Sequence, residues 1–481
     1  MRFDPNTYPD PSQSWCIEGV PCERQGDTPG EVAIPAASLV SCSFVEFDER
    51  GDFMDFAQHL ACGEKLKNLA EVQDVLLVLY CHGWKNNSQS GDVVSFNTFL
   101  TKLALSREIR ELGLRVHGVY LAWRGNSFRP YVGPSENYQW METVFGGPIV
   151  KDIYHRQTRL GWWIPENLSY WARKLAAENR VAGLPLARAI FTYAASVKRY
   201  GEKPNNRVII IGHSFGALLL ERSLGQAMTG AITLGWSEDE KGEQSFSRRL
   251  PFDMILLVNS AAPAIYAKLL RDFLEANRRA LHKNKDPQAN VPVIVSITST
   301  ADWATDKLHR LGNLLSSFVP SLSRYYNKGI LVNPTEPHKY PEHPPIRQSE
   351  FYITTEGHNK YLINHWIAPA QSEGVATFEM REDVFSANLS IDTRDPWTFQ
   401  TVGPNGKLHS WRVTAQPNLT GEPMIPAMQH SGYWIVSCGK ELIKDHNDIW
   451  SSVAMEMYAG LFRLVQSRRH GTQQLTSKAE S

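Results

Sequence analysis

Residues 207–220 read RVIIIGHSFGALLL, and this stretch decides the fold class. Its first part is an apolar run typical of a buried strand, and its last part begins a leucine-rich helical pattern. Between them, Gly212, Ser214 and Gly216 form a G-x-S-x-G pattern, which predicts a serine on a tight turn from strand to helix. Glycine suits the two flanking positions, because side chains there would collide across such a turn.

Other apolar runs and helical patterns lie on both sides of this stretch. The strand-like runs are continuous rather than alternating, which is typical of parallel strands covered on both faces. Helical patterns lie between them, and Asp92 is predicted to be the N-cap of one. The sequence therefore predicts an α/β fold with a doubly wound, mostly parallel sheet. An antiparallel hairpin over 38–47 and 53–56 is predicted at its start. The predicted core strands are 75–81, 116–123, 207–212, 252–259, 291–298 and 433–438, and the predicted helices follow Asp92 and cover 215–228 and 449–465.

The length of 481 residues suggests about three domains at roughly 150 residues each. We predict instead one domain over 38–466, because two long segments interrupt an otherwise regular alternation of strands and helices. These insertions cover about 126–206 and 312–431, and the second holds a hairpin pattern around Asn405-Gly406. An irregular N-terminal arm over 1–37 and a disordered tail over 467–481 complete the predicted organisation.

Composition excludes some classes of protein. The 50 basic and 50 acidic residues give a net charge of zero, which argues against a nucleic-acid binder that works through bulk electrostatics. With 42% hydrophobic residues, the chain can bury a large core. The 126–206 insertion is rich in aromatic residues and includes a predicted helix over 167–179. Two alternatives fit these rings: a lid above Ser214 that shapes an apolar pocket, or a helix packed against the body of the domain.

The remaining sequence features concern cysteines and targeting. Six cysteines are too few for a disulfide framework, and no pair has the spacing of zinc ligands, so we predict buried free thiols and no metal. The first residues, MRFDPNTYPDPSQSW, lack the apolar run of a signal peptide, and no stretch reaches the roughly 18 apolar residues of a transmembrane helix. These features predict a cytoplasmic protein, and export by a dedicated secretion machine is the alternative.

A second motif follows the 75–81 strand. There His82-Gly83-Trp84 forms an HG turn, and a polar loop leads from it to the next helix. Together with GHSFG, this turn resembles the α/β-hydrolase superfamily, in particular its serine esterase and lipase branch. The resemblance implies an oxyanion hole made by the backbone N–H groups of Trp84 and Phe215, and it gives His82 a structural role rather than that of a base. The residues that support these two motifs are His82, Gly83, Gly212, His213 and Gly216.

The resemblance also implies where the partners of Ser214 lie, in the chain order Ser, Asp, His. An acid is expected after a later strand, and Asp302 follows the 291–298 run, with Asp306 as the alternative. A histidine is expected after the last strand, and His446 lies in that position. The alternative is His358, within the second insertion.

This triad predicts a serine hydrolase that cleaves carboxylic esters, like a lipase, esterase or phospholipase, through an acyl-serine intermediate and without a cofactor. The expected partner is a small-molecule or lipid ester, with no nucleic acid and no transmembrane segment; the sequence predicts no oligomeric state. One alternative is another acyl-transfer enzyme on the same fold, such as a thioesterase, acyltransferase or amidase. A non-catalytic binding protein is the other, and the presence of Ser214, Asp302 and His446 argues against it.

Overall fold

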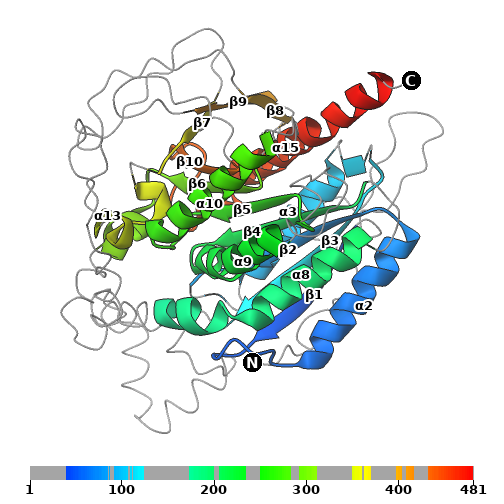
Figure 1. The fold of residues 1–481 in the computed structure, drawn as a ribbon, viewed down its shortest axis with the longest axis horizontal. Helices are drawn as coiled ribbons and strands as arrows, with labels where there is room; N and C mark the ends of the chain where they lie inside the picture. Colours follow the sequence, from blue (N-terminus) through cyan, green and yellow to red (C-terminus); the bar gives the residue numbers. More distant parts are fainter. Residues whose placement is uncertain are drawn as a thin grey trace, which may run out of the picture.

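Ten strands of this computed structural model form one mixed sheet, in the order β1-β3-β2-β4-β5-β6-β10-β7-β9-β8 (Figure 1). All pairs from β1 to β7 are parallel, whereas β9 runs antiparallel to both β7 and β8. The strands are β1 (Val40–Phe47), β2 (Val75–Cys81), β3 (Arg115–Trp123), β4 (Arg207–His213), β5 (Met254–Val258), β6 (Ile294–Ser299), β7 (His365–Pro369), β8 (Trp397–Val402), β9 (Leu408–Ala415) and β10 (Tyr433–Cys438). The structure describes residues 40–84, 86, 91–106, 109–110, 112–123, 173–199, 205–234, 250–282, 292–310, 349–359, 362–369, 397–402, 408–415 and 432–479.

Helices cover both faces of the sheet, which confirms the predicted α/β class (Figure 1). One buried cluster joins the sheet to α2, α8, α9 and α10, and a second joins its other face to α3 and α15. The helices are α2 (Phe56–Val72), α3 (Gly91–Leu105), α8 (Leu184–Arg199), α9 (Phe215–Leu234), α10 (Ala264–His282), α13 (Ser349–Ile353) and α15 (Ser452–Ala479). Four short turns accompany them: the π-helical η1 (Ala177–Val181) and η4 (Ala304–Leu308), and the 3-10 helical η5 (Glu356–His358) and η6 (Asp448–Trp450).

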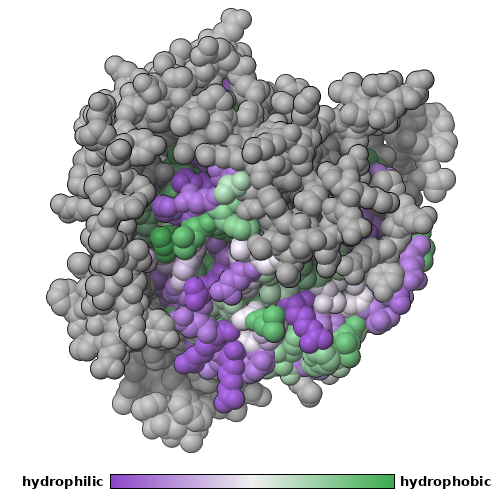
Figure 2. Space-filling model, in the orientation of Figure 1, coloured by the Kyte–Doolittle hydropathy of each residue, from purple (hydrophilic) through white to green (hydrophobic). Residues whose placement is uncertain are grey.

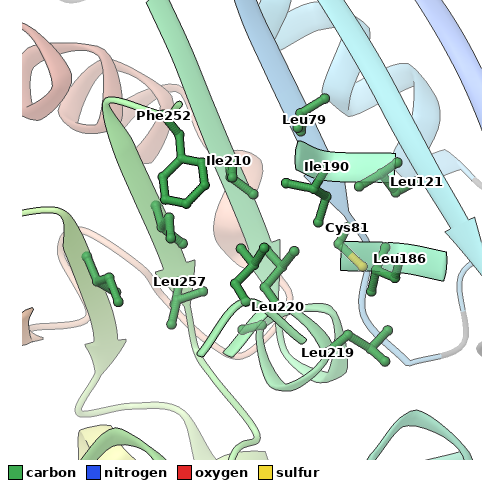
Figure 3. Packing of buried hydrophobic residues seen from close by; sticks show 14 of the residues in the cluster. Leu79, Cys81, Leu121, Leu186, Ile190, Ile210, Leu219, Leu220, Phe252 and Leu257 are labelled. Atoms are coloured by element: carbon green, nitrogen blue, oxygen red, sulfur yellow. The ribbon is translucent and has the colours of Figure 1, made fainter. Parts of the chain in front are cut away.

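The leucines of α9 form the centre of the first cluster (Figure 3). Leu219 and Leu220 are fully buried in the cluster that also contains Ile210 of β4, Leu257 of β5 and Ile190 of α8. Burial of a leucine side chain contributes about 1.5–3 kcal/mol. This packing fixes the start of α9, and with it Ser214, against the carboxyl ends of the central strands.

The six predicted core strands are all present, with ends that differ by a few residues. They could be predicted because they are buried along nearly their whole length, so most of their sequences are continuous apolar runs. The four cysteines in the described part, Cys42, Cys62, Cys81 and Cys438, are buried free thiols as predicted. Cys16 and Cys22 lie outside the described residues.

The predicted hairpin at the start of the domain is wrong. β1 pairs in parallel with β3, and the returning segment contributes only an isolated antiparallel bridge between Phe47 and Phe53. Helix α2 begins three residues after Phe53, because the Asp55 carboxylate accepts a hydrogen bond from the backbone N–H of Ala57 (2.8 Å) and caps the helix.

Asp92 is not the N-cap of α3, because the helix already begins at Gly91. Its carboxylate accepts hydrogen bonds from the hydroxyls of Tyr80 (2.9 Å) and Tyr120 (3.0 Å) and from the indole N–H of Trp450 (2.8 Å). These partners come from β2, β3 and η6, so only the tertiary structure brings them to Asp92.

The 126–206 insertion is partly a component of the core. Helix α8 lies within it, and Ile190, Tyr193 and Val197 of that helix are fully buried in the first cluster. The predicted helix over 167–179 is described only from Arg173, where the chain is helical. The aromatic cluster that suggested a lid, from Trp140 to Trp171, lies outside the described residues.

The second insertion extends the sheet. β8 and β9 form the predicted hairpin, and β7 joins it to β10; the Asn405-Gly406 turn lies outside the described residues. Helix α15 continues to Ala479, so it includes most of the 467–481 segment predicted as a tail. Lysine, arginine and glutamine are good helix formers, and several follow the buried Val465.

The described surface of the face in Figure 2 mixes hydrophilic and hydrophobic residues. Within the described ranges, we find no helix with the length and apolar character needed to cross a membrane.

Candidate active site

Ser214 lies on the sharp turn between β4 and α9, as the G-x-S-x-G pattern predicts. Its backbone φ is +55°, a left-handed conformation that costs a non-glycine residue about 1–2 kcal/mol. Two backbone hydrogen bonds stabilise this conformation. The Ser214 N–H donates to the Val258 carbonyl (3.1 Å), and the Ser214 carbonyl accepts from the Ala261 N–H (3.2 Å). The serine hydroxyl is thereby fixed at the start of a helix, at the carboxyl end of the sheet.

The two motif glycines are required by close packing around this turn. A Cβ on Gly216 would lie 2.0 Å from the Cys81 carbonyl oxygen, at the end of β2. A Cβ on Gly212 would lie 2.8 Å from the Cα of Ala217, in the first turn of α9. Any side chain at either position would push the strand ends and the helix apart.

The structure brings the three residues of the predicted triad together. His446 Nε2 lies 2.9 Å from the hydroxyl oxygen of Ser214. His446 Nδ1 lies 3.0 and 2.9 Å from the two carboxylate oxygens of Asp302. Because the carboxylate can only accept, Nδ1 carries the proton and Nε2 presents its lone pair to Ser214. A base, its orienting acid and a hydroxyl are therefore aligned, although 232 positions separate Ser214 from His446.

Asp302 is fully buried just after β6, and its carboxylate accepts hydrogen bonds from the backbone at the start of η4. Its carboxylate accepts from the backbone N–H groups of Ala304 (3.0 Å) and Thr305 (3.2 Å), and from the Thr305 hydroxyl (2.5 Å). Burial by itself raises the pKa of Asp302, but the positive charge and hydrogen bonds of His446, with other contacts that include the Thr305 hydroxyl, lower it to about 2. Asp302 is therefore an anion at neutral pH, ready to stabilise a protonated His446.

The alternative acid, Asp306, forms ion pairs with basic residues, whereas His446 contacts Asp302. Its carboxylate pairs with Arg310 (3.2 Å) and Lys307 (3.3 Å) near the surface of η4.

His446 lies between β10 and η6, and two residues from neighbouring strands hold its backbone. Its carbonyl accepts hydrogen bonds from His213 Nε2 (2.9 Å) and Asn259 Nδ2 (3.2 Å). Asn259 has a φ of +46°, and its side-chain oxygen accepts from the Ser299 N–H (3.1 Å). Asn259 therefore connects the ends of β5 and β6 to the histidine loop.

Sequence reasoning missed Asn259. A signal exists, because asparagine directly after an apolar strand tolerates the left-handed conformation better than most residues. The direction in which its side chain points depends on the tertiary structure.

His213, the residue before Ser214, is a neutral donor. Burial, together with the positive charge of His446, lowers the pKa of His213 to about 3. Its Nε2 faces a carbonyl, so the proton resides on Nε2 and supports the loop of the triad histidine.

The predicted oxyanion loop lies against Ser214. A Cβ on Gly83 would meet Nδ1 of His213 at 2.8 Å and the Cβ of Ser214 at 3.0 Å. Trp84 follows this glycine, and Phe215 begins α9, where the helix dipole is positive. Gly83 and Ser214 therefore lie in close contact, and each is directly followed by a predicted oxyanion donor, Trp84 after Gly83 and Phe215 after Ser214.

His82 is a buried structural residue. Its Nε2 accepts the backbone N–H of Trp123 (3.0 Å), while Nδ1 donates to the Gly83 carbonyl (2.9 Å). Burial lowers the pKa of His82 despite these bonds. With both nitrogens engaged, His82 is not positioned as a base.

The alternative base, His358, is connected to Asp302 through Thr305. Its Nε2 is 3.1 Å from the hydroxyl oxygen of Thr305, which in turn contacts Asp302. The structure therefore places His446, and not His358, on Ser214.

Two buried glutamates, Glu221 and Glu356, share the hydroxyl of Tyr433 as a hydrogen-bond partner. The hydroxyl of Tyr433 in β10 contacts Glu356 of η5 and lies 3.0 Å from Oε1 of Glu221 in α9. A hydroxyl has one proton, so when it donates to one carboxylate it can only accept from the other. The pair therefore holds at least one proton of its own. Burial raises the pKa of both glutamates.

We expect Glu221→Gln to flatten the pH dependence of stability. An acid with a raised pKa binds its proton more tightly in the folded state, so its contribution to stability is complete below the ordinary value of 4.5 and is lost as the pH rises. The slope reaches about 1.4 kcal/mol per pH unit for one proton. Urea unfolding at pH 5 and pH 8 measures it. Glu71→Gln, at an exposed position of α2, is the control, and equal slopes in both variants would contradict the shared proton.

The site consists of the Ser214 hydroxyl, the His446 imidazole with the buried Asp302 carboxylate, and the backbone of Gly83 beside Ser214. Among the described residues, no group of three or more histidine, cysteine, aspartate or glutamate side chains could hold a metal ion. Comparisons of the chain with protein-family models, curated proteins and solved structures found no match.

Proposed function

We propose that this protein is a serine hydrolase that cleaves carboxylic esters through an acyl-serine intermediate. One observation carries the proposal: the unbroken chain of contacts from Asp302 through His446 to Ser214, with distances of 2.9–3.0 Å. A hydroxyl needs a base to become a nucleophile at neutral pH, and this geometry supplies one.

In the first step, the hydroxyl oxygen of Ser214 attacks the ester carbonyl carbon while His446 Nε2 takes its proton. The carbonyl oxygen becomes an oxyanion, which the N–H groups of Trp84 and Phe215 would stabilise; loss of one such donor typically costs about 3 kcal/mol. His446 then gives the proton to the departing alcohol, leaving an acyl-serine.

In the second step, His446 takes a proton from water as the water oxygen attacks the acyl-serine carbonyl. Collapse of the new tetrahedral intermediate breaks the bond to Ser214, which regains its proton from His446, and the carboxylic acid leaves. Asp302 stays ionised throughout and keeps His446 in the reactive tautomer. The mechanism uses only protein groups and water.

The order of the strands supports an α/β-hydrolase fold for this chemistry. The serine follows β4, the acid follows β6 and the histidine follows β10, so all three lie at the carboxyl edge of parallel strands. Ligands of open α/β sheets bind at this edge.

A fluorophosphonate probe tests the nucleophile directly. We expect the folded protein to react at Ser214 alone, as located by mass spectrometry of the labelled peptide. Ser214→Ala should abolish the reaction, whereas Ser223→Ala, which removes a buried hydroxyl bonded only within α9, should leave it unchanged. If folded wild-type protein remains unlabelled, the proposed function is wrong. A series of p-nitrophenyl esters of increasing acyl length then identifies the preferred substrate, and turnover of none of them would exclude an esterase.

A further inference from the structure

Hydrogen bonds extend from Asp302 to residues beyond the triad. The Thr305 hydroxyl contacts carboxylate oxygen Oδ2 of Asp302, and the same hydroxyl oxygen lies 3.1 Å from Nε2 of His358. Ser214, His446, Asp302, Thr305 and His358 therefore form one continuous series.

Counting protons fixes the direction of this series. The ionised Asp302 can only accept, so Thr305 uses its single proton to donate to it. The Thr305 oxygen must then accept from Nε2 of His358, which places the proton of the neutral imidazole on Nε2. Each donor strengthens the next, because a hydroxyl that accepts a hydrogen bond becomes a better donor.

The surroundings of Asp302 show why this support matters. The carboxylate is fully buried, and it accepts hydrogen bonds from His446, two backbone N–H groups and the Thr305 hydroxyl. An ionised carboxylate in such a place depends on every hydrogen bond it receives.

The short turn η5 is held firmly enough to position His358. A Cβ on Gly357 would lie 2.0 Å from the hydroxyl oxygen of Thr298 on β6, so only glycine lets η5 approach the strand. On one side, Glu356 accepts from the Ser296 hydroxyl (2.6 Å) and contacts Tyr433. On the other, the backbone N–H of His358 donates to the Thr355 carbonyl (3.2 Å).

We propose that Thr305 and His358 are positioning residues of the active site, which orient the Asp302 carboxylate and disperse its charge so that His446 remains an effective base. This inference rests on the proposed function, since it assigns the two residues to the same triad. Neither residue touches the reacting atoms.

Several charged groups face His358 and belong to the pH behaviour of the site. These are Asp302, Asp306, Lys307 and Arg310, with the buried His309 beside them. Substitutions at Thr305, which does not titrate, separate the effect on Asp302 from the titration of these neighbours.

The test is the second-order rate of fluorophosphonate labelling at Ser214 between pH 5 and 9. We expect Thr305→Val to lower the rate roughly tenfold and to move the acid limb to higher pH. Without the threonine donor, Asp302 holds the proton of His446 more strongly, so the base stays protonated to a higher pH. Thr305→Ser restores the donor and should recover both properties, whereas Thr229→Val, which removes a hydroxyl bonded to Gly225 late in α9, controls for the substitution itself.

His358 is tested in the same way. His358→Leu should shift the rate and the acid limb in the same direction by a smaller factor, and His358→Gln, whose amide can still donate to Thr305, should restore them. If Thr305→Val is folded by circular dichroism and keeps both the wild-type rate and the wild-type acid limb, the inference is wrong.

A spectroscopic readout separates this inference from the proposed function. The proton on His446 Nδ1 should give a downfield resonance in the proton NMR spectrum that disappears in His446→Ala. We expect this resonance to move in Thr305→Val and His358→Leu even if wild-type protein fails to react with the probe. Failure to label wild-type protein overturns the proposed function alone, whereas an unmoved resonance overturns the role of Thr305 and His358.

Discussion

His446→Ala will lower the rate of fluorophosphonate labelling and of ester hydrolysis by about 10⁴-fold or more. Nε2 of His446 lies 2.9 Å from the Ser214 hydroxyl oxygen, close enough to accept its proton. Without it, the hydroxyl must lose its proton to water, and the departing alcohol loses its acid. The measurement is the labelling rate at a fixed pH, normalised to the fraction of folded protein.

His358→Ala is the matched control for this prediction. It also removes an imidazole that is hydrogen-bonded within the same network, but its ring contacts Thr305 rather than Ser214. We expect a loss of tenfold or less. Activity that survives in His446→Ala and disappears in His358→Ala would reverse the assignment of the base.

Gly216→Ala will destabilise the fold by about 3 kcal/mol or more and will abolish labelling of Ser214. The added Cβ would lie 2.0 Å from the carbonyl oxygen of Cys81 and 2.6 Å from that of His82. Both are backbone atoms at the end of a fully buried strand, so neither can move aside cheaply. Relief requires α9 to shift away from β2, which displaces the serine from His446.

Gly230→Ala provides the control, because it places the same methyl group later in the same helix. A Cβ there meets no atom within 4 Å, so helix propensity alone decides the effect. We expect Gly230→Ala to stabilise the protein by about 0.5–1 kcal/mol in urea unfolding. Equal stability of the two variants would show that the turn around Ser214 is less tightly packed than its geometry implies.

The core strands and the serine turn could be predicted because their information is local. A strand buried on both faces is mostly apolar, as in 75–81 and 208–211, so its sequence alone reveals it. The same reasoning failed at β7, where only part of the strand is buried and the apolar run is absent. It also failed after Phe53, because local turn residues suggested a returning strand where the Asp55 cap starts a helix.

The triad shows the same difference between what local sequence predicts and what depends on tertiary contacts. The sequence placed Asp302 and His446 by their position after strands, and the observed contacts agree with that placement. The contacts of Asn259 with His446 and of Thr305 with His358 were missed, because each joins residues that are distant in the sequence.

By itself, the sequence determined the α/β class and the turn that carries Ser214. Both depend on hydrophobic periodicity or on the conformational needs of a few adjacent residues. The candidates for the base and the acid came from the resemblance of the motifs to the α/β-hydrolase superfamily. Only the tertiary structure decided between His446 and His358 and between Asp302 and Asp306, since both members of each pair follow acceptable local patterns. The assignment of the base depends on which histidine lies within hydrogen-bonding distance of Ser214 at the end of β4. Strand order and packing set that distance, and no local pattern does.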